Sequence, residues 1–409
     1  MRRSLLALPM LLAAAVLGPA FADTEISGQG AGGGYYKIVV PDNWNNKLVI
    51  WNHGFSLDPV GPVEDMGPLI DIQLAEGFAV AASSYRLAGW AVFDTSDDLE
   101  EMVDAFIADS GAPDEIYLYG ASLGGLVTAA AIEQADLGNV VGAFPICGAL
   151  AGSRNWDAGL DFRLIYDVYC GKGASKIAGG PFGLDPSTAP TVEEVAAAVN
   201  ACTGVLQPEA TRTKKQKKNL KKLLKVMQIP ESFLTTDMGF STFAMADLVS
   251  HPAKLGGKLA VGNENVDYGN KKVNRKIQRV KPKKKSAKQL RKNYTPNGNV
   301  GDVKIISMHT DKDGLVIVEN ESEYAEVVPA DHLTTAIVVE AEATHCVGFT
   351  PAELTAGWIE LQAWVNTGEQ PDAERLQASC IALEPIAGGP CRIDPAFEIP
   401  DMDGRIRPR

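Results

Sequence analysis

The feature that most constrains the fold is an alternation of apolar strands with amphipathic helices, which stops near residue 150 and resumes near residue 300. Such an alternation is typical of a mostly parallel sheet with helices on both faces. The predicted strands cover residues 36–40, 47–51, 78–83, 115–119, 140–145, 303–308 and 335–340. The predicted helices of this part cover residues 98–110, 122–135, 322–327 and 351–365. We therefore expect the α/β class.

The interruption predicts a large cap inserted into the sheet domain. We expect residues 23–150 to form the first part of the core, 151–300 the cap, and 301–409 the second part of the core with a C-terminal tail. Most of the cap reads as irregular, with a Met/Phe-rich stretch over Phe233–Leu248. These apolar residues have two interpretations that stay open, namely the lining of an acyl pocket or the small core of the cap itself.

The first 22 residues are predicted to be a signal peptide. Arg2 and Arg3 precede an apolar run over Leu5–Leu17, and a small-x-small cleavage site ends at Ala22. The run is shorter than the roughly 20 residues that a bilayer requires, and no later segment is long and apolar enough to be a transmembrane segment. We expect a secreted protein, either extracellular or periplasmic.

The six cysteines make an even set, which an oxidising compartment would convert into disulfides. The preferred pairs are Cys380–Cys391 and Cys170–Cys202, and Cys147–Cys346 follows by elimination. The cysteines and histidines have no spacing typical of a zinc site, so we expect neither a metal nor another cofactor.

A Gly-x-Ser-x-Gly pattern, Gly120 to Gly124, lies where a predicted strand meets a predicted helix. Flanking glycines allow a tight bend that pushes the Ser122 hydroxyl clear of the sheet and places a helix N-terminus towards a substrate. The alternative is an ordinary glycine-rich turn in which the serine only caps the helix. We predict that Ser122 is a nucleophile.

A nucleophilic serine requires a histidine as base and a carboxylate that orients the histidine, in the chain order serine, acid, histidine. His345 follows a predicted strand and precedes a helix, so it is the expected base. His309 comes too early in the chain, and His332 precedes a strand.

The acid is Asp311 or Asp313, both in the loop after the strand 303–308. We favour Asp313 because a turn glycine and two apolar residues follow it and would seat the loop, whereas Asp311 can be a solvated turn residue. Upstream, the strand 47–51 runs into a His-Gly turn, where the backbone N–H of Phe55 is expected to form an oxyanion hole with that of Leu123.

These residues resemble the α/β-hydrolase superfamily over residues 36–150 and 293–369, and in particular a group of secreted bacterial esterase- and lipase-like hydrolases. The group's His-Thr-x-x-Asp-Pro-Leu-Val-Pro loop implies Asp313 as the acid, although Gly314 and Ile317 replace its prolines. Its His-Cys-x-Phe-Thr pattern implies His345, with one extra residue after Cys346. Members are mostly esterases, some of which act on polyesters, and the resemblance does not extend to residues 151–292.

The predicted function is cleavage of carboxylic esters, hydrophobic or polymeric, through an acyl-enzyme on Ser122. A serine peptidase with the same triad is the first alternative, disfavoured because the cap is basic and apolar. A non-catalytic surface-binding protein on a hydrolase scaffold is the second, disfavoured by the intact Ser122, Asp313 and His345.

Charge is distributed unevenly, since the net charge is −13 whereas residues 211–292 carry 22 Lys/Arg against 5 Asp/Glu. This Lys-rich segment reads as a solvated face, or as a surface that attracts an anionic lipid or acidic polymer. Nucleic acid is the least favoured partner because no interleaved aromatic residues accompany the charge.

Overall fold

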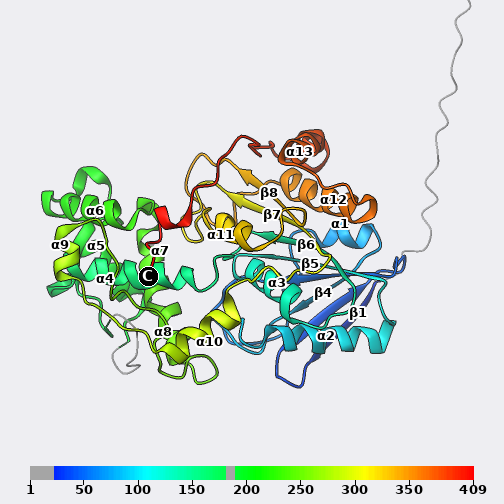
Figure 1. Cartoon of the computed structure of the whole chain (residues 1–409), viewed down its shortest axis with the longest axis horizontal. Helices are drawn as coiled ribbons and strands as arrows, with labels where there is room; N and C mark the ends of the chain where they lie inside the picture. Colours follow the sequence, from blue (N-terminus) through cyan, green and yellow to red (C-terminus); the bar gives the residue numbers. More distant parts are fainter. Residues whose placement is uncertain (1–22, 181–188) are drawn as a thin grey trace, which may run out of the picture.

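The computed structural model describes residues 23–180 and 189–409, and within them eight strands form one sheet (Figure 1). The strands are β1 (Thr24–Gln29), β2 (Tyr35–Val40), β3 (Lys47–Asn52), β4 (Ala79–Ser83), β5 (Glu115–Ala121), β6 (Val140–Ile146), β7 (Lys304–Thr310) and β8 (Leu333–Val338). Their order is β1-β2-β4-β3-β5-β6-β7-β8, and all pairs from β4 to β8 are parallel, whereas β1 and β2 are antiparallel additions. The predicted α/β class and mostly parallel sheet are confirmed.

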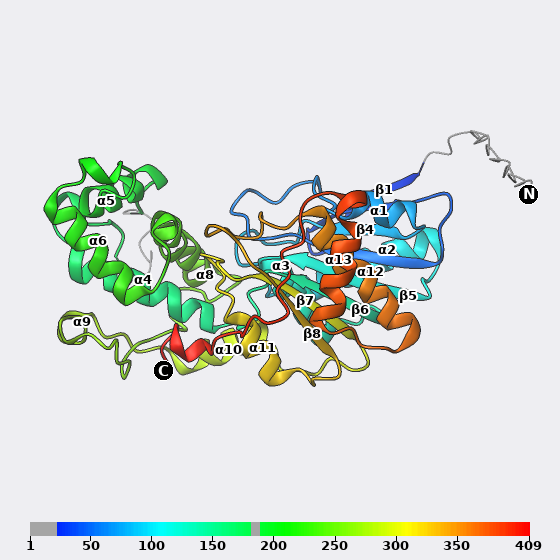
Figure 2. The ribbon, with the colours of Figure 1, turned by 90° about the horizontal axis from the view of Figure 1, so that it is seen from above.

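Helices cover both faces of this sheet (Figure 2). One face is covered by α2 (Thr95–Ser110) and α3 (Leu123–Gln134), and the other by α1 (Ile70–Ala75), α12 (Pro351–Thr367) and α13 (Ala373–Ala387). Because side chains alternate along a strand, Leu48 and Ile50 of β3 enter the core beneath α2 and α3, whereas Val49 and Trp51 enter the core beneath α12. Helix α11 (Asn320–Val327) connects β7 to β8.

The segment between β6 and β7, which we call the cap (residues 151–300), is mainly helical. It contains α4 (Arg154–Cys170), α5 (Val192–Thr203), α6 (Lys214–Met227), α7 (Leu234–Gly239), α8 (Met245–Ser250), α9 (Lys271–Lys276) and α10 (Lys284–Tyr294). The expectation that the chain turns irregular after residue 150 is wrong for α4. The sequence of α4 does not show apolar residues on one face and polar residues on the other, because the polar residues Asp161 and Arg163 are buried together with the apolar ones.

The Met/Phe-rich stretch of the cap contributes both to the hydrophobic core and to the wall of a cavity. Leu234, Met238, Met245 and Leu248 are buried in a hydrophobic cluster that continues into the sheet domain. Phe240, in a π-helical turn between α7 and α8, lines a cavity described below.

The C-terminal segment, Asp401–Arg409, is tied to the cap (Figure 1). Arg409 Nε lies 3.1 Å from Asp157 Oδ1 of α4, and Arg407 Nη2 donates to the Val226 carbonyl of α6 at 2.7 Å. Arg154 of α4 pairs with Asp403 at 2.5 Å. A segment that the sequence assigns to the tail of the core therefore connects the core to the cap.

All six cysteines form the three predicted disulfides. Cys170–Cys202 joins α4 to α5, Cys380–Cys391 closes the loop after α13, and Cys147–Cys346 joins the end of β6 to the loop after β8. These disulfides agree with an oxidising location. The predicted signal peptide lies outside the described residues, and among the described helices we find none that is long and apolar enough to cross a bilayer.

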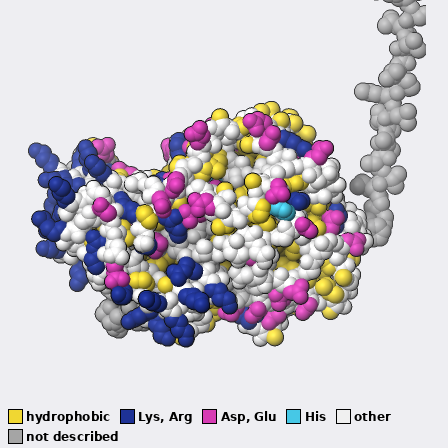
Figure 3. All heavy atoms as spheres, in the orientation of Figure 1, with side chains coloured by type: hydrophobic (Ala, Val, Ile, Leu, Met, Phe, Trp, Pro, Cys, Tyr) yellow, Lys and Arg dark blue, Asp and Glu magenta, His cyan; other side chains and the backbone are white. Residues whose placement is uncertain are grey.

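Most lysines of the cap lie on its outer surface, and the exception is Lys254, which is buried and paired with Asp247. In α6, Leu220, Leu223, Val226 and Met227 are buried, so the lysines of the helix point outwards. Lys and Arg side chains gather over this end of the molecule, whereas acidic side chains are more frequent over the sheet domain (Figure 3).

Candidate active site

Ser122 lies at a sharp turn between the end of β5 and the start of α3. Its φ of 58° is positive, a backbone conformation that a non-glycine residue rarely adopts. Gly120 and Gly124 pack against the end of β3, where a Cβ at either position would overlap the Asn52 carbonyl oxygen. The Gly-x-Ser-x-Gly pattern is therefore required by the close approach of β3 and is not an incidental feature of the turn.

The structure brings Ser122, His345 and Asp313 together in one hydrogen-bonded chain. Ser122 Oγ lies 2.8 Å from His345 Nε2, and His345 Nδ1 lies 2.7 Å from Asp313 Oδ2. Asp313 is buried, whereas the His345 side chain keeps 17% of its surface exposed. In this arrangement Nδ1 of His345 donates to the carboxylate, which leaves Nε2 free to accept the serine proton.

Asp311, the alternative acid, lies apart from this chain. Its Oδ1 accepts the backbone N–H of Glu340 at 2.8 Å. Asp313 Oδ1 accepts the N–H groups of Leu315 and Val316 at 2.9 Å and 2.8 Å, which fixes the carboxylate so that Oδ2 faces His345. Burial would raise the pKa of Asp313, but His309 and His345 outweigh it and lower this pKa below its ordinary value.

The loop that carries His345 is held from two sides. Gly314 N donates to the Thr344 carbonyl at 2.9 Å. The loop that carries Asp313, which we call the acid loop, is therefore hydrogen-bonded to the loop that carries His345. The disulfide of Cys346 anchors the next residue to the end of β6, with Cα atoms 5.7 Å apart. The additional residue that separates this loop from the family pattern is accommodated at the surface, where Val347 is 86% exposed.

His309 lies behind Asp313 and is fully buried. Its Nδ1 lies 2.9 Å from Glu321 Oε1, its Nε2 lies 2.8 Å from the Val316 carbonyl, and Nε2 is 3.6 Å from Asp313 Oδ2. Because both ring nitrogens face acceptors, both must donate, and the ring is cationic. Burial alone would lower the pKa of His309, but Asp313 and Glu321 outweigh it and raise this pKa to about 10.

The cationic state of His309 has a measurable consequence for stability. A pKa raised to about 10 in the folded state, from about 6.5 in the unfolded chain, contributes stability that is complete below pH ~6.5 and is lost as pH rises towards 10. We therefore expect the free energy of unfolding to fall between pH 7 and pH 10, and to fall less steeply in a His309→Gln variant.

Urea unfolding at several pH values measures this slope. His332→Gln is a suitable control. The His332 ring is hydrogen-bonded to the Val303 carbonyl at 3.0 Å, whereas the His309 ring lies beside two carboxylates. Parallel pH dependences for the wild type and His309→Gln would show that His309 is not a buried cation.

The turn predicted as an oxyanion hole lies beside Ser122. A Cβ at Gly54 would stand 3.6 Å from the Ser122 Cβ, so the backbone of this turn borders Ser122. The Leu123 N–H is the first of α3, where an N–H has no partner within the helix. His53 stacks on Tyr85 with ring centroids 4.2 Å apart, which holds the turn from behind. That Phe55 and Leu123 donate to an oxyanion stays a prediction.

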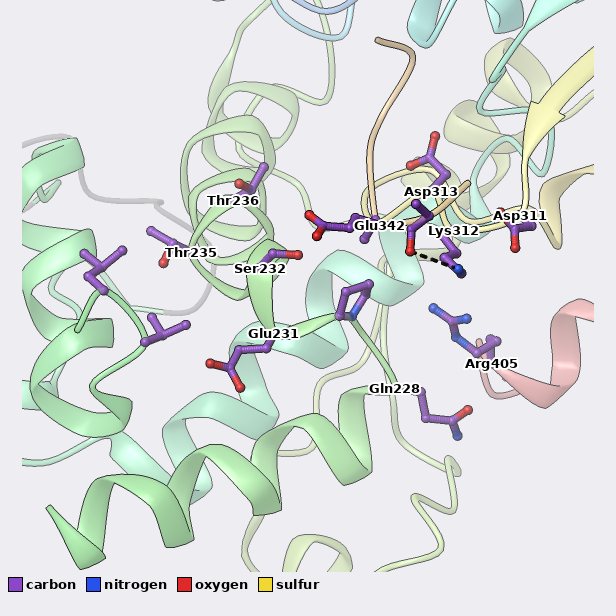
Figure 4. Close-up of a pocket in the computed structure, with 15 residues that line it drawn as sticks. Gln228, Glu231, Ser232, Thr235, Thr236, Asp311, Lys312, Asp313, Glu342 and Arg405 are labelled. Carbon is purple, nitrogen blue, oxygen red and sulfur yellow. Dashed lines mark hydrogen bonds between the residues drawn. The ribbon is translucent and has the colours of Figure 1, made fainter. Parts of the chain in front are cut away.

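An apolar cavity of about 390 Å³ opens above Ser122 and His345, between the sheet domain and the cap. Its apolar wall includes Phe55, Phe162, Met227, Phe240, Leu315 and Ile317. A more polar groove of about 960 Å³ adjoins it along the acid loop and the start of α7, and Arg405 borders both (Figure 4). A hydrophobic group would therefore fit beside the serine.

One cluster has the composition of a metal site. Asp313, His345 and Cys346 place ligand-type atoms within 4.8 Å of one another. Cys346 has no thiolate to offer because it forms a disulfide, and Asp313 and His345 bind each other. This cluster is better explained by the hydrogen-bonded chain to Ser122.

The strand order, the helices on both faces and a serine at the turn after the fifth strand define the α/β-hydrolase fold. The chain is 33% identical over 118 residues to an o-phthalyl amidase from Xanthobacter agilis, a stretch that covers 28% of this chain and 25% of the amidase. The chain thus matches only a quarter of that relative's length. No protein-family model matches the chain.

Similar solved structures include an esterase from Aspergillus oryzae, with 13% identity, a TM-score of 0.45, and coverage of 85% of this chain and 80% of that one. Another is an esterase from Rhodococcus sp. ECU1013, with 16% identity, a TM-score of 0.39, and coverage of 84% and 98%. Because these identities and TM-scores are low, the fold is assigned from the strand order of the chain itself.

His309 and the C-terminal segment are the parts of the site that the sequence analysis missed. The sequence excludes His309 as a base but does not show that Glu321 reaches it from α11. Arg405 and Ile406 line the cavity although they lie at the end of the chain. The only sequence signal was the position of His309 four residues before Asp313, at the end of a predicted strand.

Proposed function

We propose that this protein is a serine hydrolase that cleaves carboxylic esters through an acyl-enzyme on Ser122. The observation that carries the proposal is the chain from Ser122 through His345 to the buried Asp313, with distances of 2.8 Å and 2.7 Å, at the wall of an apolar cavity. This combination of a nucleophile, a base, an orienting acid and an adjacent cavity is what acyl transfer requires.

In the proposed mechanism Ser122 Oγ attacks the ester carbonyl carbon while its proton passes to His345 Nε2. Asp313 stabilises the imidazolium that forms, and the N–H groups of Phe55 and Leu123 receive the charge on the carbonyl oxygen. Collapse of the tetrahedral intermediate releases the alcohol, which takes the proton from His345. A water molecule, activated by the same histidine, then hydrolyses the acyl-enzyme.

The apolar wall of the cavity favours a hydrophobic acyl group, and polymeric esters with such groups are included in the proposal. The proposed location is extracellular or periplasmic, which fits three disulfides in one chain. Attraction of the Lys-rich cap surface to an anionic lipid or polymer stays a prediction.

Amide cleavage is the second candidate function, and one observation favours it. The relative from Xanthobacter agilis is an o-phthalyl amidase.

Matched substrates separate the two candidates. We expect the p-nitrophenyl ester of a hydrophobic acid to be hydrolysed by the wild type and not by Ser122→Ala, and the p-nitroanilide of the same acid to be cleaved no faster by the wild type than by Ser122→Ala. Cleavage of the anilide by the wild type well above the rate of Ser122→Ala would identify an amidase and contradict the ester proposal.

A further inference from the structure

Asp237 is a buried carboxyl group in the wall of the apolar cavity. It lies on α7, is 2% exposed, and lines the same cavity as Ser122 and His345. Its Oδ2 has no hydrogen-bond partner among the described residues. Buried polar groups are nearly always hydrogen-bonded, so a buried carboxyl oxygen without a partner in a cavity wall calls for an explanation.

The charges around Asp237 do not compensate for its burial. Arg405 is the nearby cation, but its Nη1 is bound to Glu319 Oε1 at 3.2 Å. Burial raises the pKa of Asp237 well above its ordinary value, the charge of Asp313 adds to this effect, and Arg405 opposes it. Asp237 is therefore held as a neutral carboxylic acid, which donates one hydrogen bond through its O–H and accepts through its carbonyl.

The surroundings of Asp237 in the cavity are aromatic and aliphatic. Phe240 stacks on Trp156 with ring centroids 5.0 Å apart and meets Phe55 edge-on at 5.8 Å, so these rings form a rigid wall. Phe162 and Ile317 line the same cavity. A ligand that fills this space would bury an apolar body against the rings. Asp65, Asn155 and Arg405 also line the cavity, but Asp237 offers it a buried carboxyl oxygen that has no partner among the described residues.

We propose that Asp237 is a hydrogen-bonding subsite for a hydroxyl group on an otherwise hydrophobic acyl group, so that hydroxylated acyl esters are the preferred substrates. This inference rests on the proposed esterase function. A hydroxyl both donates and accepts, which matches a neutral carboxylic acid. An ammonium group would be repelled by Arg405, which lines the same cavity.

The proposal is tested with p-nitrophenyl 3-phenylpropanoate and its 3- and 4-hydroxyphenyl counterparts. In the wild type we expect kcat/KM to be about tenfold higher for at least one hydroxylated ester, as one hydrogen bond to a buried polar group provides. In Asp237→Leu the ratio should fall to about one, because leucine has the same number and branching of side-chain heavy atoms but no hydrogen-bonding group. Asp237→Asn should retain part of the preference because an amide also donates and accepts.

Thr236→Val is the matched control, since Thr236 is on the same helix but borders the groove. It should keep the wild-type ratio. A ratio that is the same in the wild type and in Asp237→Leu would overturn the subsite, as would a stronger preference of the wild type for the 4-aminomethylphenyl ester, which carries a cation. Absence of hydrolysis of every ester by the wild type would refute the proposed function itself, so the two failures are distinguishable. Circular dichroism and thermal unfolding verify that each variant is folded.

Discussion

Replacement of Ser122 by alanine is expected to lower kcat for ester hydrolysis by about 10⁶-fold, with little change in KM. The Ser122 Oγ atom is the one that would form the covalent intermediate. Among the described residues no other hydroxyl group is hydrogen-bonded to His345. The cavity and the backbone N–H groups of Phe55 and Leu123 remain, so substrate binding should persist.

Steady-state kinetics at high enzyme concentration measures this loss. Ser110→Ala, at the end of α2 and remote from the cavity, is the control and should retain full activity. A Ser122→Ala variant that keeps more than about 1% of the activity would mean that the hydrolysis uses another nucleophile.

Replacement of Asp313 by asparagine is expected to lower kcat by about 10⁴-fold. The carboxylate holds His345 with its proton on Nδ1, and an asparagine NH₂ group would favour the opposite tautomer, in which Nε2 cannot accept the serine proton. Stability should also fall, because the cationic His309 loses one of its two carboxylate neighbours.

Asp311→Asn is the matched control for this prediction. Among the described residues its carboxylate accepts a hydrogen bond only from the backbone N–H of Glu340, so we expect less than about a tenfold change in kcat. Because the sequence alone left the choice between Asp311 and Asp313 open, the reverse ranking of the two variants would show that the hydrogen-bonded chain of the structure is not the catalytic one.

The parts of this fold that the sequence predicts are those that depend on local pattern. Apolar runs alternating with helices indicate the sheet, and the glycines on either side of Ser122 mark the turn because a Cβ there would meet β3. His345 could be placed because it follows a strand and precedes α12, which begins with a capping box between Thr350 and Glu353.

The parts that the sequence does not predict depend on contacts between distant segments. Helix α4 lacks the one-sided apolar pattern of an amphipathic helix because its Asp161 is buried. This burial depends on an ion pair with Arg409 of the C-terminal segment. Asp237 reads as an ordinary polar helix residue, and its burial against the cavity follows only from the way the cap packs on the sheet domain. Glu321 likewise reaches His309 only because α11 folds back on β7.

The most direct test of the central claim is covalent labelling with a fluorophosphonate, followed by mass spectrometry of the intact protein and of its peptides. We expect one phosphonyl group per chain, attached to Ser122, together with loss of esterase activity in proportion to labelling and no label in Ser122→Ala. A wild-type protein that hydrolyses esters but is not labelled, or is labelled at another residue, would contradict the assignment of Ser122 as the nucleophile.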